Sequence, residues 1–144
     1  MSFDPELFMS TSVDAEMATK YDPVPEGEYT GVIKSVAIRN PKENMVILDV
    51  TWDIDDPALA ERLGRESVTV RQSVFLDISD SGGIAVGPNK NVGLGRLREA
   101  VGQNNPGPWS PAMLEGAGPA RITVEHRIDG ENTYDGVKRV AKAA

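Results

Sequence analysis

The segment Lys90–Gly102, KNVGLGRLREAVG, decides the fold because it is the most strongly helical stretch in a sequence that otherwise favours strands. Its apolar residues recur at the helical spacing i, i+3, i+7, namely Leu94, Leu97 and Val101. Asn89 is placed to cap the start, and Gly102 stands where a glycine commonly ends a helix. The segment therefore predicts one amphipathic helix over Lys90–Val101.

Five runs with strand-like character flank this helix, three before it and two after it. The expected strands are Glu28–Ile38, Met45–Ile54, Ser67–Asp77, Ala120–Ile128 and Asn132–Ala141. Trp52 alternates with valine and leucine in the second strand, which predicts a core position. Gly31 and the pair Asp135-Gly136 interrupt two strands and predict a bulge or bend at each place.

The order β-β-β-α-β-β is that of a five-stranded OB-fold barrel. The predicted fold class is therefore all-β with one helix, an OB-fold-like barrel over residues 22–144 preceded by an N-terminal arm over residues 1–21. Shorter helical or turn segments are expected at residues 57–64, with an aspartate as cap, and after Ser110. His126 alternates with apolar residues, so a hydrogen-bonded core or edge histidine is expected.

The charge of the chain is unevenly distributed. The 144 residues carry a net charge of −7, and residues 1–28 hold seven acidic groups against the single basic residue Lys20. Residues 29–144 are close to neutral, with 14 basic and 15 acidic groups. The acidic pI of about 4.7 therefore describes the arm more than the body. A near-neutral body with clustered Arg and Lys is compatible with a nucleic-acid partner.

Several function classes find no support in the sequence. There is no cysteine and a single histidine, which argues against disulfides, thiol catalysis and a multi-histidine metal site. Asp53, Asp55 and Asp56 resemble a Mg²⁺-binding cluster, but a strand end followed by a helix cap explains them better. Ser79–Gly83 matches neither a nucleophile elbow nor a P-loop. We expect no catalytic residue, metal or cofactor, and hence a protein that is not an enzyme.

No apolar run approaches the ~20 residues that a membrane helix needs. The N-terminus also lacks the basic and apolar regions of a secretory signal. These patterns favour a protein of the cytoplasm with no membrane partner.

The residues that could bind a nucleic acid combine cations with exposed aromatics. Single-strand binders stack bases on aromatic rings and neutralise phosphates with Arg and Lys. Phe75 shares a strand face with Arg71, and this pair fits that chemistry best. Solvated surface charge or local packing explains each position about equally well. The candidate nucleic-acid-binding residues are Arg39, Lys42, Arg71, Phe75, Arg127, Tyr134, Lys138 and Arg139.

The segments PVPEGEYTGVI, MVILDVTWDI, GRLREAVG, LEGAGPARITVEHR and YDGVKRV resemble a phage-encoded family of domains of unknown function. Members of that family are encoded among replication and recombination genes, and the resemblance covers roughly residues 22–141. It implies an OB-like barrel and a role as a phage single-stranded-DNA-binding protein in the host cytoplasm. Many such proteins end in an acidic C-terminal tail, whereas this chain ends in VAKAA and is acidic at its N-terminus.

Two hypotheses of different class follow. The first is sequence-independent binding of single-stranded DNA in phage replication or recombination, with proteins of those processes as further partners. The alternative is a non-enzymatic structural or interaction module whose arm docks on a neighbouring subunit and builds a homo-oligomer. The acidic arm could also mimic nucleic acid and cover the binding groove.

Overall fold

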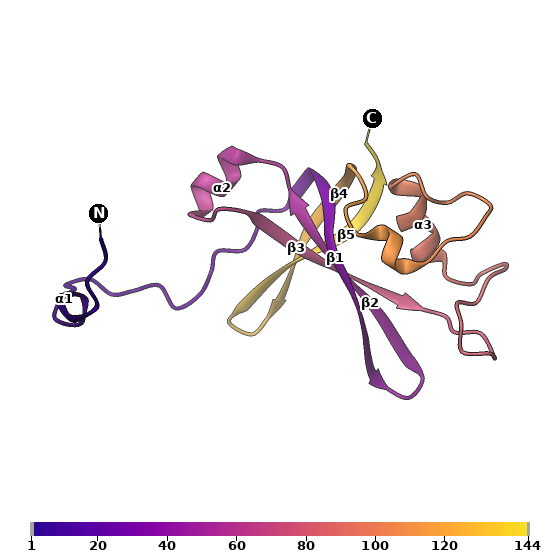
Figure 1. Ribbon diagram of the computed structural model, residues 1–144, viewed down its shortest axis with the longest axis horizontal. Coiled ribbons are helices and arrows are strands. Elements are labelled where there is room, and N and C mark those ends of the chain that lie inside the picture. The colour runs from indigo at the N-terminus through magenta and orange to yellow at the C-terminus, as the bar shows by residue number, and fades with distance from the viewer. Residues whose placement is uncertain (1, 144) are drawn as a thin grey trace.

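The computed structural model describes residues 2–143 as one five-stranded antiparallel sheet with a few short helices (Figure 1). The strands lie in the order β3-β2-β1-β4-β5. Their bounds are β1 Gly27–Lys42, β2 Met45–Ile54, β3 Val68–Leu76, β4 Ala120–Asp129 and β5 Asn132–Lys142. The α-helices are α1 Pro5–Met9, α2 Pro57–Leu63 and α3 Val92–Ala100, and a 3₁₀ helix, η1, spans Pro111–Leu114.

The predicted order of strands and helix is confirmed, whereas the single helix is corrected and the closed barrel is not confirmed. Besides α3, the described residues form α1, α2 and η1, so a single helix was too few. The sheet is also open, because β3 and β5 are its two edges and are not hydrogen-bonded to each other. The helix α3 starts two residues later than expected because Asn91, not Asn89, precedes its first turn.

The long strand β1 joins the two halves of the sheet. Its first residues pair with β4 and the rest pair with β2, so the change of partner falls at Gly31. A side chain there would lie 3.1 Å from Ile122 Cδ1 and 3.2 Å from both Trp52 Cε3 and the Asp53 carbonyl oxygen. A side chain at position 31 would therefore crowd the core. The bulge predicted at Gly31 is not found there: the register of β1 and β2 shifts at Lys34 instead.

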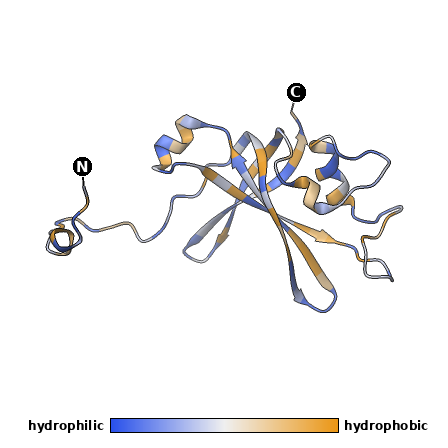
Figure 2. Ribbon diagram, viewed as in Figure 1, coloured by the Kyte–Doolittle hydropathy of each residue, from blue (hydrophilic) through white to orange (hydrophobic). Residues whose placement is uncertain are grey.

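The core lies inside the curled sheet and is closed at one end by α3 and η1. Its largest side chain is Trp52, which is fully buried as predicted and donates a hydrogen bond from Nε1 to Gln72 Oε1 at 2.9 Å. Leu94 and Leu97 of α3 and Leu114 of η1 are buried in the same cluster. Figure 2 shows the resulting alternation of apolar and polar residues along the strands. Alternation in β2 and β3 thus gives one face to the core and leaves the other for contacts outside it.

The edges of β3 and β5 approach each other without forming a ladder. A Cβ atom at Gly136 would lie 3.7 Å from the carbonyl oxygen of Arg71. We call this line the seam of the sheet. The prediction of a bulge at Asp135-Gly136 is wrong: the register of β4 and β5 shifts at Lys138 instead, and Gly136 lies on the seam beside Arg71.

The root of the N-terminal arm is clamped to the body at Val24. This residue is fully buried. Its N–H donates to Asp135 Oδ2 at 2.7 Å, and its carbonyl oxygen lies 2.6 Å from His126 Nε2. His126 is half-buried at the sheet's margin and hydrogen-bonded, as predicted. Residues 2–22 are exposed, and Figure 1 shows them leaving the body.

None of the helices in residues 2–143 has the length and apolar character needed to cross a membrane.

Candidate nucleic-acid interface

Two clefts lie along the seam, one on each side of the close approach at Gly136. The first, of about 750 Å³, lies between the start of β3, the tip of the β4–β5 hairpin and the root of the arm. The second, of about 580 Å³, lies between the end of β3, the middle of β5 and α3. Successive residues of β3 line the two clefts, Thr69–Arg71 the first and Gln72–Phe75 the second. The clefts therefore form one track along the β3 edge, narrowed at Gly136.

The first cleft has mixed charge. Its cations are Lys20, Arg65 and Arg71, and its carboxylates are Asp22 and Asp135. Tyr134 lies on the hairpin side, and the guanidinium of Arg127 lies 5.2 Å from the centre of its ring. Arg71, Arg127 and Tyr134 are thus brought together at this end of the track, as single residues of three different strands.

The second cleft is basic. It is lined by the cations Arg96, Lys138 and Arg139, and none of the described residues that line it is acidic. Phe75 projects there with 63% of its surface exposed. Ile47 lies opposite Phe75 in the register but is only 3% exposed, so Phe75 is the aromatic surface that the cleft offers. An exposed ring beside three cations is suited to a ligand with flat apolar groups and repeated negative charge.

The bulge in β5 lies at the second cleft. Thr123 pairs with Arg139 and Val124 pairs with Val137, so Lys138 is the extra residue. Simple alternation would turn Lys138 and Arg139 to opposite faces. A bulge re-aims side chains, and four consecutive residues, Val137–Val140, line the cleft.

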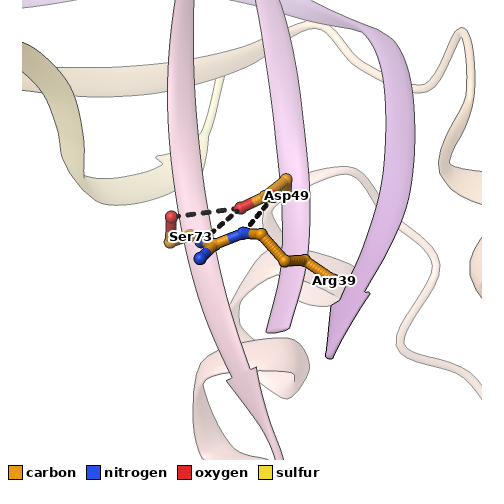
Figure 3. A network of polar contacts seen from close by, with 3 residues as sticks. All are labelled: Arg39, Asp49 and Ser73. Carbon is orange, nitrogen blue, oxygen red and sulfur yellow. Dashed lines mark hydrogen bonds and ion pairs between the residues drawn. The ribbon is translucent and has the colours of Figure 1, made fainter. Parts of the chain in front are cut away.

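Arg39 lies on the same face but is held by an ion pair (Figure 3). Its Nε donates to Asp49 Oδ2 at 2.8 Å, its Nη2 donates to Asp49 Oδ1 at 3.1 Å, and Ser73 Oγ donates to the same Oδ1 at 3.2 Å. Hydrogen bonding from Arg39 holds the pKa of Asp49 below its usual range, and the same bonds raise the pKa of Arg39. Two of the guanidinium nitrogens of Arg39 are therefore already bonded to a carboxylate, so Arg39 is a weaker candidate for binding phosphate.

Lys42 lies apart from the two clefts. It is the last residue of β1, at the β1–β2 hairpin, and its side chain is exposed. Of the eight predicted residues, Arg71 and Tyr134 line the first cleft, and Phe75, Lys138 and Arg139 line the second. Arg127 does not line the first cleft but contacts the ring of Tyr134.

Three cations of the track, Lys20, Arg65 and Arg96, are not among the residues predicted from the sequence, and Lys20 belongs to the acidic arm. Arg65 follows the left-handed Gly64 at the end of α2, and Arg96 lies on the exposed face of α3. The signal for Arg96 was its place on the helical face opposite the buried leucines, but the sequence could not say that this face meets β5. Arg65 gave no such signal.

The remaining polar candidates have local structural partners. Asp56 accepts a hydrogen bond from Leu59 N at 3.1 Å and caps α2, as predicted. The indole of Trp109 lies under Arg98, with the guanidinium 4.2 Å from the ring centre, and donates from Nε1 to Gln103 Oε1 at 2.8 Å. Across residues 2–143, no group of three or more His, Cys, Asp or Glu side chains is arranged to hold a metal ion.

No protein-family model matches the sequence, and no curated protein matches it. The resemblance to a phage family of replication and recombination modules therefore stays a prediction.

Proposed function

We propose that this protein binds single-stranded DNA without sequence preference, as an accessory protein of phage DNA replication or recombination. The observation that carries the proposal is the second cleft, where the exposed ring of Phe75 stands beside three cations. Base stacking contributes roughly 1–3 kcal/mol per base and tolerates any sequence, and cations neutralise the phosphates. In this proposal the protein is a binding protein of the host cytoplasm, with no catalytic role.

The position of the track supports an OB-like reading of the open sheet. OB folds bind oligonucleotides on the face of their second and third strands and with the loops that join strands one to two and four to five. Here the track follows β3, and the β4–β5 hairpin tip lines the first cleft. We propose that the body is an OB-like barrel whose seam is left unpaired along the binding track.

The test is a titration of dye-labelled oligo-dT with the full-length protein, followed by fluorescence anisotropy over a series of salt concentrations. We expect saturable binding that weakens steeply with salt, with a slope of log K against log salt of about −0.7 for each phosphate neutralised. No binding at tens of micromolar protein in low salt would refute the proposal.

A pair of matched variants locates the binding to the second cleft. Lys138→Gln removes a cation of that cleft, and Lys34→Gln removes an exposed cation of β1 outside both clefts. We expect Lys138→Gln to weaken binding and to reduce the salt slope by about 0.7, with Lys34→Gln close to wild type. Equal effects of the two variants would place the DNA elsewhere.

An interaction module is the second candidate, and the arm favours it. Six large apolar side chains of the arm are at least 60% exposed, namely Phe3, Leu7, Phe8, Met9, Val13 and Met17. Clustered exposed apolar residues commonly mark a protein-binding segment. If the arm docks on a neighbouring subunit, light scattering will show a mass above that of one chain that is lost when residues 2–19 are deleted.

A further inference from the structure

The arm combines the two chemical features that the second cleft is suited to bind. Residues 2–19 carry Asp4, Glu6, Asp14 and Glu16 and no Lys or Arg. At their start, Asp4 caps α1 by accepting hydrogen bonds from Glu6 N at 3.0 Å and Leu7 N at 3.4 Å. Phe3 and Phe8 are 71% and 61% exposed and their ring centres lie 5.3 Å apart. The segment thus presents two rings and two carboxylates, with Phe3 and Asp4 directly before one short helix and Glu6 and Phe8 on it.

Aromatic rings and negative charges are also what a single strand of nucleic acid would bring to the cleft. Phe3 and Phe8 can pack on the exposed ring of Phe75 in the way that bases would. Asp4 and Glu6 can face the cations Arg96, Lys138 and Arg139, for which no acidic partner lines the cleft among the described residues.

The arm is attached at a distance that suits this contact. Lys20, Tyr21 and Asp22 line the first cleft, and Lys20 Nζ donates to the Glu131 carbonyl oxygen at 3.2 Å. From Thr69 to Phe75 the track is about 20 Å long at ~3.3 Å per residue. The ten residues 10–19 have a root-mean-square length of roughly 17 Å as a flexible chain. A linker whose length matches the span gives an effective concentration in the millimolar range.

In the structure α1 is undocked: among the described residues, no hydrogen bond or ion pair joins residues 2–19 to the body. We propose that residues 3–9 bind in the second cleft of their own chain, in competition with single-stranded nucleic acid. The competition rests on the proposed function, whereas the contact between arm and cleft does not. The docked arm then covers the second cleft. A long single strand displaces the arm, whereas weakly binding anionic ligands do not.

The chain is free of cysteine, so a single introduced thiol can report the contact. A nitroxide on Ser2→Cys in the full-length ¹⁵N-labelled protein should broaden the amide signals of Phe75 and Arg96 in about 0.01 M salt. The broadening should be lost in about 1 M salt, where the screening length falls from ~30 Å to ~3 Å. Unbroadened signals of Phe75 and Arg96 in low salt would overturn the proposal.

Two variant pairs separate a specific contact from random collisions of the arm. Phe3→Ser with Phe8→Ser removes the two rings, whereas Val13→Ser with Met17→Ser removes two apolar side chains of similar exposure from the linker. We expect the first pair to lose more than half of the broadening and the second pair to keep it. Equal loss in both pairs would contradict a contact made by α1.

A mixed sample distinguishes the chain's own cleft from that of a second copy. Here the nitroxide is on unlabelled protein and the ¹⁵N label is on unmodified protein. Broadening of Phe75 in this sample would assign the cleft to a neighbouring chain and overturn the proposal. Oligo-dT should remove the broadening in the single-species sample. Broadening that persists although oligo-dT is bound would overturn the competition, and broadening without any oligo-dT binding would keep the arm contact and refute only the proposed function.

Discussion

The two faces of β2 and β3 show how one pair of strands serves two purposes. The inner face carries Trp52, which is fully buried and hydrogen-bonded to Gln72. The outer face ends in Phe75, which is 63% exposed beside three cations. Both residues are aromatic and lie on neighbouring strands, so their side-chain chemistry alone does not separate them. Their place in the two-residue alternation does, and it assigns stability to one face and binding to the other.

The distinction between the two faces fails if replacing Trp52 changes the free energy of unfolding only slightly. Trp52→Ala should lower the free energy of unfolding by about 3–5 kcal/mol, because it leaves a cavity in the core and an unpaired Gln72 oxygen. Urea unfolding followed by circular dichroism measures the loss. Phe75→Ala is the matched control and should lie within about 0.5 kcal/mol of wild type. Similar losses for both variants would show that the outer face is part of the fold.

The opposite result is expected for binding. Phe75→Ala should weaken oligo-dT binding by about 1–3 kcal/mol, or roughly 5- to 150-fold, at unchanged thermal stability. Ile128→Ala removes a side chain that is 75% exposed on β4 and should leave the affinity unchanged. Fluorescence anisotropy at fixed salt gives both values. An unaffected Phe75→Ala variant would remove the ring from the proposed interface.

Alanine substitutions at Gly31 and Gly95 compare a closely packed position with an open one. Gly31→Ala should cost about 1–3 kcal/mol because its Cβ would crowd Trp52 and Ile122, and the backbone of Asp53 cannot yield easily. Gly95→Ala meets open space inside α3 and should stabilise the protein by about 0.5–1 kcal/mol. The midpoint temperatures of thermal unfolding should shift in opposite directions in the two variants. A shift in the same direction for both would contradict the packing described at Gly31.

The smallest effect concerns the ion pair on the outer face. The pKa of Asp49 is lower in the folded state than in the unfolded chain, where it is about 3.9. The ion pair therefore contributes fully to stability above the unfolded-state pKa, and this contribution is lost as the pH falls through the lower native pKa. Arg39→Gln should therefore be slightly less stable than wild type at pH 7, and the difference should shrink below about pH 4. Urea midpoints at a series of pH values measure this, and a difference independent of pH would exclude the pair as its cause.

The sequence carried the local part of the fold but not the contacts between distant segments. All five strands and the helix over residues 92–100 follow from alternation and helical spacing, which are local properties. The register between β4 and β5 is not local, so the bulge at Lys138 was missed. Alternation places Ile128 on the same face as the buried Ile122 and Val124, yet it is 75% exposed because β4 runs beyond the core toward its hairpin.

The candidate interface was predictable to a similar degree. Arg71 and Phe75 share a face by alternation and were selected for that reason. The pairing of Arg39 with Asp49 depends on the register of β1 and β2, which the hairpin fixes only in three dimensions. Arg96 enters the second cleft because α3 packs beside β5, and no pattern within the helix encodes its neighbour.

The unpaired seam also bears on how the protein avoids aggregation. Exposed strand edges are templates for pairing with strands of other molecules. A Cβ atom at Gly136 would lie 3.7 Å from the Arg71 carbonyl oxygen, so each edge occupies part of the space that an incoming strand would need at the other. The two edges thus shield each other from edge-to-edge association, with no hydrogen-bond ladder between them.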